Sequence, residues 1–244
     1  MSERYQRQLM LPEVGEAGQK RLSQAKVLVI GVGGLGSPLS LYVAAAGVGT
    51  IGLVDGDQVE LNNLHRQIIH STKTLGQDKV GSAAQRIKEL NPDVRVEEHR
   101  VRLTKENAES IVQAYDIVAD CTDNFAARYL INDVCVKLKK PLSHGAIYKF
   151  EGQLITIIPG QSPCYRCIFP EPAQIEDLPS PAGAGLLGVV PGVIGVLQAN
   201  EILKYLLGVG ELLQGRLLIF NALRASFRSL KVSTRKNCPA CASS

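Results

Sequence analysis

The chain has 244 residues, of which 45% are hydrophobic and 20% charged, and a net charge of +4. This composition excludes an intrinsically disordered protein, and the charge is too small to indicate nucleic-acid binding by itself. The N-terminal stretch MSERYQRQLML lacks the apolar core of a secretion signal. Six cysteines in a chain of this length are more typical of reduced thiols than of a disulfide framework, so we expect a cytoplasmic location.

Strand and helix patterns alternate over the first 140 residues. Strands are predicted at 26–31, 50–55, 95–103 and 116–121, and helices at 37–46, 75–90, 106–114 and 126–138. This alternation predicts a parallel sheet covered by helices on both faces. Two later β-rich runs, 142–158 and 217–232, surround a predicted helix at 193–207. We therefore predict the α/β class, with a Rossmann-like, doubly wound, mainly parallel sheet that antiparallel C-terminal strands extend.

The stretch 178–200 contains no charged residue and is long enough to cross a membrane. It also contains three prolines and five glycines, which break a helix and leave backbone groups unpaired in lipid. We interpret it as a Gly/Pro-rich loop that runs into a buried helix, and we expect no membrane span.

A glycine-rich loop, GVGGLG at 31–36, directly follows the first predicted strand and opens a helix. Glycines such as Gly33, Gly34 and Gly36 let a phosphate approach backbone amides at the positive end of that helix. A nucleotide site is favoured over a merely structural turn because of this strand–loop–helix context. Asp55 ends the second strand, where a carboxylate would bind ribose hydroxyls. These features describe NAD as well as ATP.

The segment that follows Asp55 favours ATP. It carries Asp57, Asn62, Asn63, Arg66 and Gln67, and Lys79 stands near the start of the next predicted helix. Two cations together could hold a triphosphate, whereas either one alone would more often belong to an ordinary surface salt bridge.

The motif DCTDN at 120–124 ends the fourth predicted strand. Carboxyl ends of strands near the reversal of strand order line the ligand crevice of such sheets. Asp123 is therefore predicted to hold Mg²⁺ against the phosphates. It could also cap the N-terminus of the next helix, and the two roles are compatible.

Four of the six cysteines form two CxxC pairs, Cys164 with Cys167 and Cys238 with Cys241, with 70 residues between the pairs. Four thiolates are the ligands that structural Zn²⁺ prefers, and two pairs favour zinc over a redox site. We expect this site to fasten the C-terminal tail to the loop after Ile158. Cys121 and Cys135 lie in apolar patterns and are expected in the core.

The ordered set GVGGLGS, VDGDQVELNNLHRQ, GQDKV, CTDN, FEGQ, CYRC, AGLLGVVPGVIGVLQANEILK and CPAC, with RYQRQ near the start, resembles the MoeB/ThiF/HesA adenylyltransferases. These are the bacterial relatives of ubiquitin-activating enzymes. The similarity runs from Arg4 to Cys241 and implies one adenylation domain over 1–244. Its parts would be an N-terminal arm (1–25), a nucleotide-binding half (26–140) and a carrier-binding, zinc-containing half (141–244).

The resemblance implies that ATP and Mg²⁺ convert the C-terminal Gly-Gly of a small ubiquitin-like sulfur carrier into an acyl adenylate. It assigns phosphate-loop, ribose, phosphate and Mg²⁺ contacts to Gly33, Gly34, Gly36, Asp55, Asp57, Asn63, Arg66, Gln67, Lys79, Asp123 and Asn124. Arg7 matches an arginine that crosses a homodimer interface into the partner's ATP site. The molybdopterin pathway is slightly favoured over the thiamine pathway.

One position departs from some relatives, which carry a cysteine that binds the carrier or its sulfur covalently. Ser180 and Pro181 stand at or beside that position, and a serine without a base is a poor substitute for a thiolate. We expect adenylation only, with sulfur from a separate cysteine desulfurase or rhodanese-like protein. We also expect no appended rhodanese domain, given the length after Cys241.

Three alternatives remain open from the residues. An NAD-dependent oxidoreductase would leave the cations, Asp123 and the CxxC pairs without roles. A non-catalytic protein that only docks ubiquitin-like folds would not need the cations and Asp123. A small peptide could replace the carrier as substrate.

Overall fold

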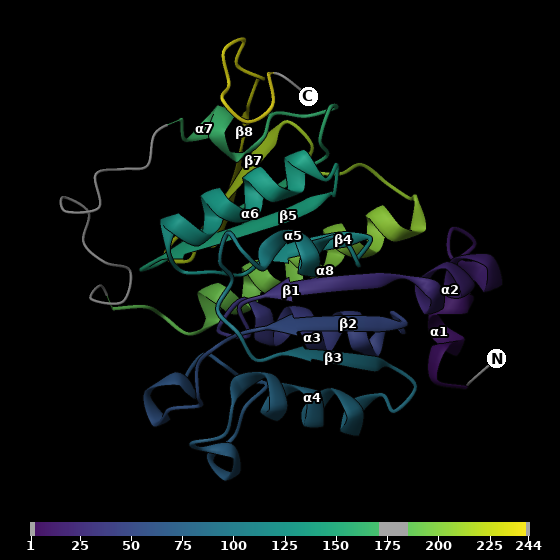
Figure 1. Cartoon of the computed structure of the whole chain (residues 1–244). Helices are drawn as coiled ribbons and strands as arrows, with labels where there is room; N and C mark the ends of the chain where they lie inside the picture. Colours follow the sequence, from purple (N-terminus) through teal and green to yellow (C-terminus); the bar gives the residue numbers. More distant parts are fainter. Residues whose placement is uncertain (1–2, 171–184, 243–244) are drawn as a thin grey trace.

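The computed structural model describes residues 3–170 and 185–242, so the expected departure at Ser180 lies outside the described residues. The described strands form one sheet of order β3-β2-β1-β4-β5-β6-β7-β8 (Figure 1). Their bounds are β1 Lys26–Ile30, β2 Thr50–Val54, β3 Arg95–His99, β4 Ile117–Asp120, β5 Leu142–Tyr148, β6 Glu151–Ile157, β7 Arg216–Asn221 and β8 Ser226–Lys231. The first five run parallel, and β6, β7 and β8 are antiparallel. The predicted α/β sheet with antiparallel C-terminal strands is confirmed.

Two hydrophobic cores lie on opposite faces of this sheet, because successive side chains of a strand point to opposite sides. In β1, Val27 and Val29 join one core, and Leu28 and Ile30 join the other. The helices that cover the faces are α2 Gly15–Gln24, α3 Gly36–Ala45, α4 Lys79–Leu90 and α8 Val189–Leu207 on the first, and α5 Ala108–Val112, α6 Phe125–Lys137 and α7 Tyr165–Ile168 on the second (Figure 1).

Several element boundaries differ from the sequence predictions. The third strand ends at His99 rather than at residue 103, and the chain turns away from the sheet there. The fourth helix begins at Lys79 rather than at residue 75, because Gly76 has φ of +78° in a turn that precedes it. The last helix begins earlier, at Val189, and accommodates Pro191 in its first turn, where a proline breaks no hydrogen bond. The predicted N-terminal arm contains α1 Gln6–Leu9 and α2.

Helix α8 is the apolar helix that follows the Gly/Pro-rich stretch. It packs against α3 and against β5 and β6. Two of its polar side chains are buried, and Glu201 accepts hydrogen bonds from the Thr156 hydroxyl (2.6 Å) and the Leu213 amide (2.7 Å). Among the described helices, none is long and apolar enough to cross a membrane.

Candidate functional site

A cavity of about 1090 Å³ opens at the carboxyl ends of β1, β2 and β4, where the strand order reverses. Its lining includes most of the predicted nucleotide-site residues: Gly33, Gly34, Asp55, Asp57, Asn63, Arg66, Gln67, Lys79, Asp123 and Asn124. Gly36 is buried behind the lining. A second cavity of about 690 Å³, beside β7 and β8, is lined by none of these residues. The crevice at the strand-order reversal is therefore the candidate site.

The glycine loop requires glycine at two positions that bring backbone against backbone. Gly31 has φ of +92°, and a Cβ there would lie 2.7 Å from the carbonyl oxygen of Cys121. A Cβ on Gly36 would lie 2.1 Å from the carbonyl oxygen of Gly31. The loop therefore folds tightly against β4 and leads into the first turn of α3, whose amides lack intrahelical partners.

Two side chains, the half-buried Asp55 and the buried His70, hold the peptide units of Val32 in this loop. The carboxylate of Asp55 accepts hydrogen bonds from the amides of Val32 (2.8 Å) and Asp57 (2.9 Å). His70 contacts the Val32 carbonyl oxygen through Nε2 (3.0 Å) and the Ser82 hydroxyl through Nδ1 (2.9 Å). Burial lowers the pKa of His70, which favours a neutral ring that donates to Val32 and accepts from Ser82. His70 therefore connects the glycine loop to α4, although nothing in its sequence context distinguishes it.

Lys79 and Arg102 both contact Asp57 at the wall of the cavity. The Lys79 ammonium lies 3.4 Å from one carboxylate oxygen, and the Arg102 guanidinium lies 3.0 Å from the other. Burial raises the pKa of Asp57, but the charges and hydrogen bonds of Lys79 and Arg102 outweigh it and hold that pKa below its usual value. Lys79 is only 8% exposed while the Asp57 side chain is half exposed, so the cation of this pair, but not its carboxylate, is shielded from solvent.

Arg102 is a cavity residue that the sequence predictions missed. It falls within the predicted strand 95–103, but β3 ends at His99, and the following loop brings Arg102 back over Asp57. Arg66, which was predicted, donates to the Asn62 carbonyl oxygen (3.0 Å) and lies 2.8 Å from the His65 ring nitrogen Nε2. Arg66, Lys79 and Arg102 therefore line one cavity, together with Lys105 and Lys149.

Asp123 lies exposed at the rim of the cavity, directly before α6. The expectation that it caps this helix is wrong by one residue, because Asn124 accepts the hydrogen bond from the Ala127 amide (2.9 Å). Within 3–170 and 185–242, no group donates a hydrogen bond to the Asp123 carboxylate. Its oxygens are therefore available to a ligand or cation in the cavity.

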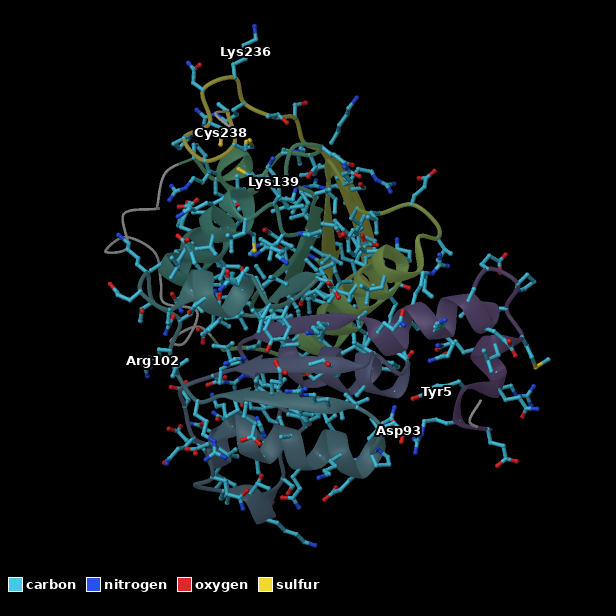
Figure 2. The ribbon with its side chains drawn as sticks, turned by 45° about the vertical axis from the view of Figure 1, so that its right-hand side comes forward. Tyr5, Asp93, Arg102, Lys139, Lys236 and Cys238 are labelled. Atoms are coloured by element: carbon cyan, nitrogen blue, oxygen red, sulfur yellow. The ribbon has the colours of Figure 1, made fainter. Side chains whose placement is uncertain are left out.

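The four CxxC cysteines converge where the C-terminal tail returns to α7. Figure 1 shows the tail beside α7, and Figure 2 labels Cys238 in it. All four sulfur atoms lie within 4.8 Å of one another, and the closest pairs are Cys167–Cys241 (3.4 Å) and Cys164–Cys238 (3.5 Å). Sulfurs at 2.3 Å from a tetrahedral Zn²⁺ would be about 3.8 Å apart. Burial raises the pKa of Cys164 to about 11. Burial also acts to raise the pKa of Cys238, but hydrogen bonds from the Ala240 and Cys241 amides lower it to about 7.

The other two cysteines, Cys121 and Cys135, are buried in the core as predicted. Cys121 touches the cavity, but burial and the neighbouring Asp120 raise the pKa of its thiol well above the usual value. It is therefore a poor nucleophile.

Arg7 is the predicted site residue that the structure does not bring to the cavity. It is exposed on α1, next to Tyr5, whose hydroxyl accepts a hydrogen bond from Asn91 (2.8 Å) just before β3. Figure 2 shows Tyr5 and Asp93 at one end of the sheet and Arg102 at the other. Arg7 therefore lies far from the cavity of its own chain.

Residues 5–240 match the model of the ThiF family. A sulfur carrier protein adenylyltransferase from Thermus thermophilus is 51% identical over 244 residues, which cover 98% of this chain and 90% of the relative. A SAMP-activating enzyme E1 from Haloferax volcanii is 47% identical, with 98% of this chain and 88% of the relative covered.

The adenylyltransferase and sulfurtransferase MOCS3-2 of Zea mays is 53% identical over 238 residues, and this chain spans only 49% of its length. Among solved structures, E. coli MccB with ATP superposes with a TM-score of 0.86 at 22% identity, over 99% of this chain and 75% of MccB. At this level of sequence identity, the similarity to MccB supports the fold alone.

Proposed function

Since the chain belongs to the ThiF family and is an enzyme of the adenylyltransferase class, we propose that it uses ATP to activate the C-terminal glycine carboxylate of a small ubiquitin-like sulfur carrier. The observation that carries the proposal is the single cavity in which the glycine loop, Lys79, Arg66 and Asp123 meet. An NAD-dependent oxidoreductase would leave the last three without a role.

The proposed reaction is a displacement at the α-phosphorus of ATP. A carboxylate oxygen of the carrier forms the new P–O bond, the bond between the α-phosphorus and the bridging oxygen breaks, and pyrophosphate leaves with that electron pair. The attacking carboxylate is already ionised, so no catalytic base is needed. The protein must align two anions and stabilise charge on the leaving group.

The cavity residues divide this work by position. The backbone of the glycine loop would receive the phosphates, and Asp55, which already fixes Val32, would meet the ribose. Lys79, Arg66, Asn63 and Gln67 would contact the triphosphate. Gln67 supports this assignment, because its buried Oε1 has no hydrogen-bond partner among the described residues.

Asp123 and Asn124 offer oxygen ligands of the kind that Mg²⁺ prefers, and the uncommitted carboxylate of Asp123 fits this role. Mg²⁺ bound there would neutralise charge on the phosphates. The position of Asp123 before α6 would place it beside the reacting α-phosphate.

The cysteine cluster fits a structural Zn²⁺ site with four thiolate ligands, Cys164, Cys167, Cys238 and Cys241. Its sulfur–sulfur distances bracket the tetrahedral value, and the Arg235 amide lies 3.5 Å from the Cys167 sulfur, a contact that would stabilise a thiolate. Four protein ligands leave no open position, so the metal would fasten the tail rather than catalyse.

We propose a homodimer in which Arg7 of one chain enters the cavity of the other. Its place at the far end of its own sheet supports this, because a phosphate contact within one chain would need a large rearrangement. The sulfur donor would be a separate cysteine desulfurase or rhodanese-like protein. The molybdopterin pathway is slightly favoured for the carrier over the thiamine pathway or another sulfur-carrier system.

The test is the exchange of labelled pyrophosphate into ATP by the purified chain with each candidate carrier. The proposal expects exchange that needs both Mg²⁺ and a carrier with an intact C-terminal Gly-Gly, and no response to NAD. Absence of exchange with every carrier, despite ATP binding, would contradict it. A covalent link between the chain and the carrier that added thiols reverse, and that is retained in Ser180→Ala, would contradict the prediction that the chain only adenylates its carrier.

A further inference from the structure

A buried acid–base pair lies directly behind the rim of the cavity. Asp120 ends β4 and His144 is its neighbour in β5, paired with it in the sheet register. Their side chains are 1% and 3% exposed, and His144 Nδ1 lies 2.7 Å from Asp120 Oδ2. Neither residue belongs to the proposed nucleotide contacts, so this buried pair needs another explanation.

The second oxygen of Asp120 shapes the turn that carries Asp123. Oδ1 accepts hydrogen bonds from the amide (3.0 Å) and the hydroxyl (2.7 Å) of Thr122, the residue before Asp123. Buried Arg128 donates to the Thr122 carbonyl oxygen (3.2 Å) from the other side. Burial acts to raise the pKa of Asp120, but the His144 hydrogen bond and charges nearby hold it below its usual value. Asp120 is therefore ionised and can accept all three bonds.

His144 also contacts the residue that follows the first cysteine of the first CxxC pair. Its ring lies edge-on to Tyr165, with ring centroids 4.7 Å apart, and Tyr165 stands between Cys164 and Cys167. A continuous line of contacts thus runs from the cysteine cluster through Tyr165, His144 and Asp120 to the turn at Thr122.

A second line of contacts joins the same cysteine pair to α6, the helix that begins directly after Asp123 and Asn124. The Tyr165 amide donates to Asn132 (2.8 Å). Arg166 forms a two-pronged ion pair with Asp133 (2.7 and 2.8 Å). Both sides of the Asp123 turn are therefore fixed from the cysteine-containing half of the molecule.

We propose that His144 and Tyr165 are positioning residues that set the place of Asp123 in the cavity, so that the first cysteine pair supports the reaction centre as well as the C-terminal tail. This inference rests on the proposed function, because it takes Asp123 as the residue that holds Mg²⁺. Groups that orient metal ligands typically change metal affinity or activity by about 10- to 100-fold when removed.

Two substitutions of His144 separate its hydrogen bond from its ring. His144→Phe keeps a ring against Tyr165 but loses the bond to Asp120, whereas His144→Asn keeps a donor close to the position of Nδ1. We expect His144→Phe to raise the Mg²⁺ concentration for half-maximal pyrophosphate exchange by about 10-fold or more and to lower kcat. His144→Asn should stay within about 3-fold of the wild type, and KM for the carrier should change in neither variant.

Ser143→Ala is the matched control, because Ser143 is equally buried in β5 and its hydroxyl contacts no partner among the described residues. Tyr165→Leu tests the link to the cysteines, with bound metal measured by mass spectrometry and the His144 ring resonances by NMR. We expect shifted His144 resonances and reduced kcat at unchanged metal content.

Variants that unfold at lower temperature but keep wild-type kcat and Mg²⁺ dependence would overturn the inference and leave a purely structural pair. Equal losses of kcat and of Mg²⁺ affinity in His144→Asn and His144→Phe would also overturn it. So would His144 resonances that do not shift in Tyr165→Leu. A wild-type chain without carrier-dependent exchange would instead contradict the proposed function itself.

Discussion

Lys79 reaches Asp57 at 3.4 Å while most of its side chain is buried, so the ammonium of this helix-opening lysine is already committed to a carboxylate. A triphosphate in the cavity would therefore compete with Asp57 for Lys79 and for Arg102 on its other side. Asp57 therefore keeps both cations oriented toward the cavity wall before any anionic ligand binds.

Lys79→Met should reduce carrier-dependent pyrophosphate exchange by about 10²- to 10³-fold, because a buried cation aimed at developing negative charge is hard to replace. Arg102→Ala should reduce this exchange less, since the Arg102 side chain is 82% exposed and solvent screens its charge. Steady-state exchange kinetics at saturating carrier measure both. A larger loss in Arg102→Ala than in Lys79→Met would show that Arg102 is the main phosphate contact.

Asp57→Asn should make the stability of the chain less sensitive to acid. The folded-state pKa of Asp57 lies below its value in the unfolded chain, about 3.9, so its stabilising contribution is complete above that value. The contribution is lost as the pH falls through the folded-state pKa. Urea unfolding between pH 6 and pH 3 should show a steeper loss in the wild type than in the variant. Parallel curves would contradict the assignment.

Asp123→Asn should lower exchange by about 10²-fold or more while the fold is retained, because an amide is a weaker Mg²⁺ ligand than a carboxylate. Asp93→Asn is the control, since Asp93 is an exposed acid at the other end of the sheet (Figure 2). Exchange assays over a Mg²⁺ titration test this, and equal activity of the two variants would rule out the assigned role.

Cys238→Ser should abolish stoichiometric metal binding and lower the free energy of unfolding by about 2 kcal/mol or more, because loss of a structural metal removes its binding energy from the folded state. Cys135→Ala is the matched control, since Cys135 is buried on α6 outside the cluster. Elemental analysis and urea unfolding measure the two effects. Retention of one Zn²⁺ per chain in Cys238→Ser would refute the four-thiolate site.

Arg7→Ala and Asp123→Ala should each be inactive alone and should regain activity when mixed. If Arg7 acts across a dimer, a mixed dimer contains one site in which both residues are intact. When equal amounts of the two variants re-pair at random, half of the dimers are mixed. About one quarter of the wild-type number of active sites is then restored. Exchange assays after denaturation and co-refolding measure the recovery. No recovery, despite mixed dimers detected by tag capture, would argue against an arginine supplied in trans.

Local patterns were enough to predict the sheet, the glycine loop and the two CxxC pairs. The run KVLVI followed by GVGGLG specifies a strand and a tight turn from neighbours in the chain, and the CxxC spacing is typical of metal knuckles. Asp123 and Lys79 were proposed in the same way, because each lies close to the end or the start of a predicted element.

The residues that were missed depend on contacts between distant parts of the chain. His70 and His144 have ordinary neighbours in the sequence, and their roles come from Val32 and Asp120, 38 and 24 residues away. Arg102 was missed because the alternation of side-chain types in the sequence continues to residue 103, whereas the β2–β3 hydrogen-bonded ladder ends at His99. The cap assignment failed because Asp and Asn are equally good caps, and only backbone geometry selects Asn124.

The separation of the two CxxC pairs also affects how the chain is made. At 5 to 20 residues per second, a ribosome needs about 4 to 14 s to add the 70 residues between them. Throughout that interval, Cys164 and Cys167 stand on the nascent chain without their two partners. If the four thiols form the proposed zinc site, the first pair meets the redox conditions of the cell before that site can be completed. Zinc supply and oxidant level during synthesis would then determine how much of the protein matures.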